Sequence, residues 1–268
     1  LAQRRLGNFE NAEKAYQEAL KQWQSSGNSI WQANVLNNLG FLQYLRGQYE
    51  QAALSFERAL QHTRLAMYPV TEGYILISMG DLFRDIGAYN EAQPAYDLAK
   101  EIVIALDEPE MSFFLDLSIS VMNRVRSNSE ESDKFLVMAR TKADNSGSVF
   151  QKNIVRFEYS ASCLKKGEQI SVLNELDDLS GRFSHQSEIT EALRTNLLLA
   201  VAHLLNKKWA QAQVTLQNVR DSKLIEPAKN ILIQTGIEFK DIFDEANQHL
   251  VGFEPITYLL KLVNEYQI

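Results

Sequence analysis

Apolar residues recur along this chain at intervals of three and four, and the pattern returns every 40 residues. Residues 30–46 form one such segment, in which the recurring positions are Val35, Leu36, Leu39 and Leu42. This spacing is typical of a helix with one buried face. Residues 49–66 form a second segment, with small and large side chains on one face at Ala52, Phe56 and Ala59. The two segments predict a pair of helices with a corner near residue 47.

A glycine followed two positions later by an aromatic residue marks that corner. The motif occurs three times at a spacing of 40 residues, as Gly7 with Phe9, Gly47 with Tyr49, and Gly87 with Tyr89. Glycine suits the end of a helix because it adopts left-handed backbone angles at little steric cost. Three copies at one fixed period predict a repeat protein in which each unit is a helix pair.

The register continues beyond residue 110, although the corner motif fades. The small residue of the first helix stays in step as Gly40, Gly80, Ser120, Ser160 and Ala200. A match over five consecutive steps predicts degenerate repeats without insertions. The predicted units are 1–27, 28–67 and 68–107, then the degenerate units 108–146, 147–184 and 185–223, and a C-terminal cap over 224–268.

The cap departs from the repeat pattern. Lys240 stands where earlier units carry a small residue, so its second helix is expected to begin late, near Gly252 or Glu254. Pro255 then falls in the first turn, where a missing amide is harmless. An atypical last unit is typical of a solenoid cap.

The repeated residues resemble those of the tetratricopeptide repeat (TPR). The matching set in the second unit is Leu39, Gly40, Gly47, Tyr49, Ala52, Phe56 and Ala59. The resemblance implies an all-α fold, a right-handed superhelical solenoid of about seven helix-turn-helix units. HEAT and armadillo repeats have comparable periods but lack the Leu-Gly and Gly-x-Tyr pairs, so they are the second interpretation.

The period is longer than the usual TPR period of about 34 residues. Long repeats of this kind are similar to those in the effector domains of large ATP-binding LuxR-type transcription regulators. Residues 1–6 look like the tail of a helix whose start is missing, so the chain is expected to be a fragment of a longer protein.

Composition narrows the classes of partner. The chain has 268 residues, of which 45% are apolar, and a net charge of −7, which argues against a nucleic acid or an anionic membrane as partner. Its one cysteine, Cys163, excludes an intrachain disulfide and favours a reducing, cytoplasmic location. The longest nearly apolar run, residues 197–205, is too short to span a bilayer.

No set of residues in the sequence indicates catalysis. The four histidines are His62, His185, His203 and His249, and they are scattered without the spacing of metal ligands. The glycines are single and mostly at corners, so no loop is built to hold a phosphate. We therefore predict a protein that is not an enzyme and has neither catalytic residues, a metal site nor a cofactor.

The TPR resemblance implies that the first helix of each unit lines a concave face on which partners bind. The positions projected onto this face are Asn37, Phe41, Tyr44, Ile77, Asp81, Arg84, Leu117, Val121, Arg124, Phe157, Leu164 and Lys165. Arg84 and Arg124 share a repeat position, which predicts a clamp for a carboxylate or an acidic side chain beside an apolar slot. In the alternative interpretation Asp81 and Asp85 neutralise Arg84, and tight winding or another domain covers the apolar wall.

These features predict a scaffold that binds a protein or peptide and serves as the regulatory part of a larger signalling or transcription regulator. Two other functions fit the sequence. One is a domain that senses a small-molecule effector between the fourth and sixth units. The other is self-association as a homo-oligomer through exposed terminal helices.

Overall fold

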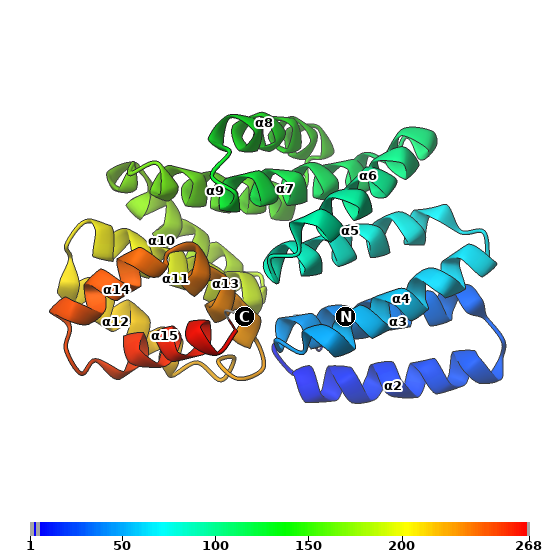
Figure 1. Ribbon diagram of the computed structural model, residues 1–268, viewed down its shortest axis with the longest axis horizontal. Coiled ribbons are helices and arrows are strands. Elements are labelled where there is room, and N and C mark those ends of the chain that lie inside the picture. Colours follow the sequence, from blue (N-terminus) through cyan, green and yellow to red (C-terminus); the bar gives the residue numbers. More distant parts are fainter. Residues whose placement is uncertain (1–2, 4–5, 267–268) are drawn as a thin grey trace. The chain divides into compact units, whose positions relative to one another are not determined.

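The computed structural model describes residue 3 and residues 6–266, so most of the helix tail predicted at residues 1–6 lies outside the described residues. Helices are the only regular elements in the described part, and successive helices from α2 to α8 run antiparallel to one another (Figure 1). The fold is all-α, and its regular helix pairs are those of a TPR-like solenoid. None of the described helices is both long and apolar enough to cross a membrane.

The first ten described helices are each 17 or 18 residues long. We call the odd-numbered ones A helices and the even-numbered ones B helices. Their bounds are α2 (Phe9–Ser25), α3 (Ser29–Leu45), α4 (Tyr49–Leu65), α5 (Pro69–Asp85), α6 (Tyr89–Leu106), α7 (Pro109–Val125), α8 (Ser129–Ser146), α9 (Val149–Lys165), α10 (Gln169–His185) and α11 (Ile189–Leu205).

The corners between these helices share one backbone feature. Each contains a residue with positive φ, and these residues follow one another at intervals of 20 as Gly7, Gly27, Gly47, Met67, Gly87, Asp107, Ser127, Gly147, Gly167, Ser187 and Lys207. A side chain in this left-handed region costs about 1–2 kcal/mol. The corners that lack glycine nevertheless keep the same geometry, because the lengths of the flanking helices place the turn there.

Small residues in the A helices let aromatic rings of the B helices lie against the backbone. A Cβ added at Gly40 of α3 would come within 2.7 Å of the Phe56 ring of α4. A Cβ added at Gly80 of α5 would come within 2.3 Å of the Tyr96 ring of α6. Both rings are fully buried. The Leu-Gly position of the repeat is thus a contact between a helix backbone and the next helix's ring.

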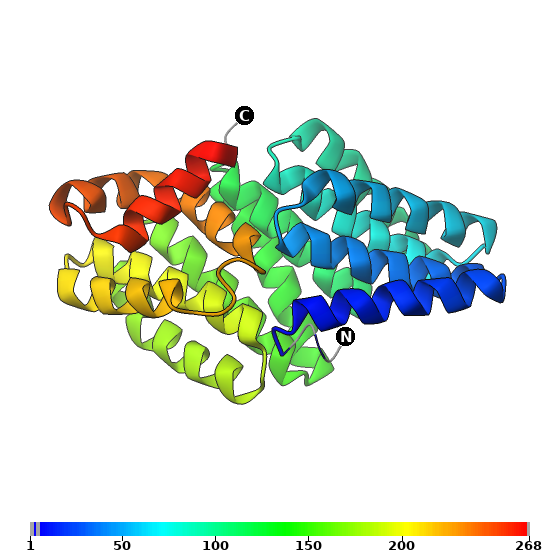
Figure 2. The same ribbon diagram turned by 90° about the horizontal axis from the view of Figure 1, so that it is seen from below.

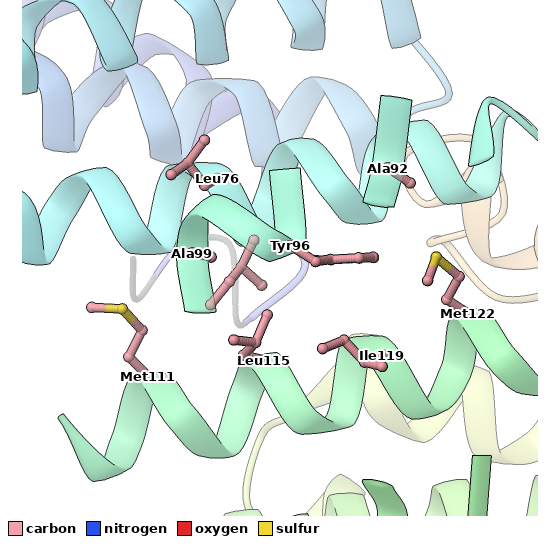
Figure 3. Packing of buried hydrophobic residues seen from close by; sticks show 9 residues of the cluster. Leu76, Ala92, Tyr96, Ala99, Met111, Leu115, Ile119 and Met122 are labelled. Carbon is pink, nitrogen blue, oxygen red and sulfur yellow. The ribbon is translucent and has the colours of Figure 1, made fainter. Parts of the chain in front are cut away.

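Helices α5, α6 and α7 share one hydrophobic core, in which the α7 side chains project toward the other two helices (Figure 3). Its buried members are Leu76, Ile77, Ala92, Tyr96, Ala99, Met111, Leu115, Ile119 and Met122. Tyr96 lies between α5 and α7, so one ring joins a helix pair to the A helix that follows it (Figure 3).

The chain divides within α9 into two compact units. Unit 1 comprises residues 8–155 with residue 3, and unit 2 comprises residues 156–266 with residues 6–7. The single solenoid over residues 1–268 and the repeat boundaries expected from the sequence stay predictions.

The regular spacing ends in unit 2, after the short helix α12 (Trp209–Arg220). The next A helix is divided into α13 (Lys229–Glu238) and α14 (Lys240–His249), with the break at Phe239 (Figure 2). The break falls beside Lys240, where earlier A helices have a small residue. The last helix, α15 (Glu254–Tyr266), begins where the sequence predicted, with Pro255 in its first turn.

The contact between Gly80 and Tyr96 predicts opposite effects of alanine at two helical glycines. Gly80→Ala should lower the free energy of unfolding by about 1–3 kcal/mol, because the ring has no space to move into. Gly181→Ala in α10 is the matched control, since a Cβ there meets no other atom within 4 Å. It should raise stability by about 0.5–1 kcal/mol. Urea unfolding of both variants measures the difference, and a stabilising Gly80→Ala would contradict the packing described.

Candidate functional site

The A helices of unit 1 lie next to one another, α3 against α5 and α5 against α7. Residues at one repeat position lie on the same side of each helix, since the helices and corners have nearly constant lengths. On one side of α3, α5 and α7, six of the predicted partner-binding residues are neither fully buried nor fully exposed. We call this surface the A-face of unit 1 and define it by Asn37, Phe41, Tyr44, Asp81, Leu117 and Val121.

Arg84 is held from two directions by carboxylates of its own helix. Its Nε donates to Asp85 Oδ1 at 2.7 Å, and its Nη1 donates to Asp81 Oδ1 at 2.6 Å. Only 9% of the Arg84 side chain is exposed. This is the arrangement of the alternative interpretation, in which Asp81 and Asp85 neutralise Arg84.

Two tyrosines extend this ion pair to neighbouring helices. The Tyr44 hydroxyl of α3 donates to Asp85 Oδ2, and the Tyr96 hydroxyl of α6 donates to Asp81 Oδ1 at 2.8 Å. The Ser118 hydroxyl of α7 lies close to Asp81. We call these residues the ionic network: Tyr44, Asp81, Arg84, Asp85, Tyr96 and Ser118. It joins four helices of unit 1 at the A-face.

Burial and the charges of neighbouring side chains together set the pKa values in the ionic network. Burial raises the pKa of Asp81 above its usual value, against the opposing effect of the Arg84 cation. Burial and the nearby Asp81 carboxylate raise the pKa of Tyr96 well above 10. Although burial alone would lower it, Asp85 and Asp81 raise the pKa of Arg84 further. Arg84 and both tyrosines therefore stay protonated at neutral pH.

Aromatic rings lie beside the ionic network on α3. The Phe41 and Tyr44 ring centroids are 5.7 Å apart, and those of Tyr44 and Tyr49 are 6.4 Å apart. Asn37 precedes Phe41 by one helical turn, and its buried Oδ1 has no hydrogen-bond partner among the residues described. The A-face of unit 1 thus combines aromatic rings with the partly exposed Asp81 carboxylate.

Two other predicted residues of unit 1 are buried. Ile77 belongs to the core shared by α5, α6 and α7, so it offers little surface to a partner. Arg124 is only 7% exposed. That Arg124 lies near Arg84, and that the two arginines form a clamp, are still predictions.

The predicted apolar positions of unit 2 are buried within the chain itself. Phe157 and Leu164 of α9 belong to the core. The Arg194 guanidinium of α11 lies 4.6 Å from the centre of the Phe157 ring and donates to Glu158 Oε1 at 3.0 Å. Phe157 and Leu164 therefore do not form an open slot in this structure.

Lys165 remains exposed but has an intramolecular role in unit 2. Its Nζ donates to the Glu238 carbonyl oxygen at 2.9 Å and lies 5.4 Å from the centre of the Phe239 ring. Glu238 is the last residue of α13, where unpaired carbonyls and the helix dipole attract a cation. Lys165 thus caps the helix break.

Residues 1–64 match a family described as the tetratricopeptide repeat. The match supports the TPR family. TPR repeats generally bind proteins or peptides and are generally non-catalytic. No curated protein matches this chain. In the part of the chain that the structure describes, no group of three or more His, Cys, Asp or Glu residues is arranged to hold a metal ion.

The hydroxyl of Tyr96 was missed by sequence reasoning, which assigned this residue to packing alone. We expect Tyr96→Phe to lower the free energy of unfolding by about 1–2 kcal/mol, because Asp81 loses a partly buried hydrogen bond. Tyr89→Phe in the same helix is the control, since its ring keeps the contact with Arg126 at 5.6 Å. It should change stability by less than about 0.5 kcal/mol. Equal effects in thermal unfolding would show that the Tyr96 hydroxyl contributes little.

The raised pKa of Asp81 predicts a pH dependence of stability. A carboxyl whose pKa is higher in the folded state than in the unfolded chain stabilises the fold below its ordinary value, 3.8, and loses this contribution as the pH rises through the raised value. The wild type should therefore lose stability relative to Asp81→Asn over this interval. Urea unfolding at a series of pH values measures the difference, and a difference that is constant or changes in the opposite direction would refute the assignment.

Proposed function

We propose that this chain is a non-catalytic scaffold that binds a protein or peptide on the A-face of unit 1. The observation that carries the proposal is a contrast in burial. Phe41, Tyr44 and Val121 of unit 1 are partly exposed, whereas Phe157 and Leu164 of unit 2 are buried. TPR repeats generally bind proteins or peptides, which supports the same assignment.

The spacing of the A helices suits an extended segment of a partner. Packed helices lie about 8–10 Å apart, so three of them present a surface about 20 Å long. An extended chain advances about 3.3 Å per residue, which corresponds to about six residues of peptide. Repeated side chains at one position on α3, α5 and α7 would meet successive parts of such a segment.

The arginine clamp would require an acidic group on the partner. Such a group would have to compete with Asp81 and Asp85 for Arg84. Arg84 and Arg124 are also both less than one-tenth exposed. The burial and the ion pairs therefore favour the peptide-binding role without the carboxylate clamp.

We further propose that the scaffold is the regulatory part of a larger signalling or transcription regulator. The support is the 40-residue period of the repeats, which is similar to that of the effector domains of LuxR-type regulators. A cytoplasmic location belongs to this same proposal.

Peptides selected from a phage-displayed library of random dodecamers against the whole chain provide the test. Val121→Arg places a bulky charged side chain on the A-face of unit 1 and should weaken the selected peptides at least about tenfold, or about 1.4 kcal/mol. Val137→Arg is the matched control because Val137 is an exposed residue of α8. It should leave the dissociation constants unchanged.

Fluorescence anisotropy with labelled peptides gives the dissociation constants, and thermal unfolding checks that both variants fold. If the selected peptides bind the wild type and Val121→Arg with equal affinity, the proposal is refuted. A selection that enriches no peptide refutes it too.

A further inference from the structure

The members of the ionic network differ in how far they reach the surface. The Arg84 and Asp85 side chains are each 9% exposed, whereas 28% of the Asp81 side chain is exposed. A carboxylate offers about four lone-pair positions. Arg84 and Tyr96 are the donors described for Asp81, and both hydrogen-bond to its Oδ1. Asp81 therefore retains an acceptor position that solvent or a partner can reach.

The charge arrangement lets Asp81 accept a second cation. Two carboxylates face one guanidinium, and Asp85 contacts Arg84 at 2.7 Å independently of Asp81. If Asp81 shares its charge with a ligand, Arg84 keeps a direct anionic partner. A charge-assisted hydrogen bond to the partly exposed Asp81 carboxylate then forms without leaving a buried cation unpaired.

The aromatic rings next to Asp81 suit the same kind of ligand. The Tyr44 hydroxyl donates to Asp85 Oδ2, and Asp85 and Asp81 both bind Arg84, so Tyr44 lies beside the pair of acids. The Tyr44 ring in turn contacts Phe41, with the two ring planes tilted by 45°. A ring face beside a carboxylate attracts an ammonium or guanidinium group through its quadrupole.

We propose that the A-face of unit 1 recognises a basic side chain, lysine or arginine, in the segment that binds there. The cation hydrogen-bonds to Asp81, and its alkyl stem lies along the rings of Phe41 and Tyr44. This inference rests on the proposed function and names the chemistry of the partner. It is the reverse of the acidic partner that the repeated arginines suggested.

The test uses the peptides selected on the whole chain. They should share one lysine or arginine, and replacing it by norleucine should weaken binding about tenfold, or about 1.4 kcal/mol. Asp81→Asn should weaken the parent peptide to a similar extent. The norleucine peptide should then bind the wild type and Asp81→Asn with equal affinity, because the two changes remove the same contact.

Asp97→Asn is the control, since Asp97 is an exposed acid on α6 that accepts a hydrogen bond from Gln93. It should leave the affinity unchanged. The norleucine peptide leaves the protein intact, so the result does not depend on the folding of Asp81→Asn.

The outcomes separate this inference from the proposed function. If peptides without a basic residue bind equally well and Asp81→Asn has no effect, while Val121→Arg still weakens them, the basic partner is wrong and the binding face stands. Enrichment of acidic residues would also overturn the basic partner. If Val121→Arg has no effect either, both proposals fail.

Discussion

The close approach of each A helix to its B helix is the contact on which the rest of unit 1 depends. Gly80 leaves no side chain between the α5 backbone and the Tyr96 ring, so the ring lies directly against the helix. Because the ring lies so close to α5, the Tyr96 hydroxyl reaches Asp81 on the A-face of unit 1. One steric requirement, a missing side chain, therefore sets both the helix spacing in the core and the position of the carboxylate at the surface.

The register of the repeats could be predicted from the sequence because it is a local property. Small and large residues alternate with the helical period, and the helix lengths fix where each corner falls. The burial of unit 2 could not be predicted in this way. Phe157 is covered by Arg194, and Lys165 is engaged by the end of α13, so these contacts join residues far apart in the chain. A repeat period describes positions within a unit and carries no information about such contacts.

The ionic network was partly predictable. The neutralisation of Arg84 by Asp81 and Asp85 was expected as an alternative. The pair with Asp81 follows from the spacing of three residues on one helix, whereas Asp85 is the sequence neighbour of Arg84 and its contact does not follow from helical spacing. The tyrosine hydroxyls were missed because an aromatic residue at the Phe56 position was assigned to packing. A signal was present: the second unit pairs Phe56 with Phe41, and the third pairs Tyr96 with Asp81 at the same two positions. Where the ring gained a hydroxyl, the facing A helix gained an acceptor.

The left-handed residues spaced 20 apart have a consequence for how this chain can change over time. Met67, Ser127 and Lys207 show that glycine at a corner can be replaced, whereas a change in helix length cannot be absorbed so easily. One inserted residue turns everything after it by about 100° around the helix axis, which carries the later surface positions away from their neighbours. The chain is therefore free to vary what each helix displays but constrained in how many residues separate one display position from the next.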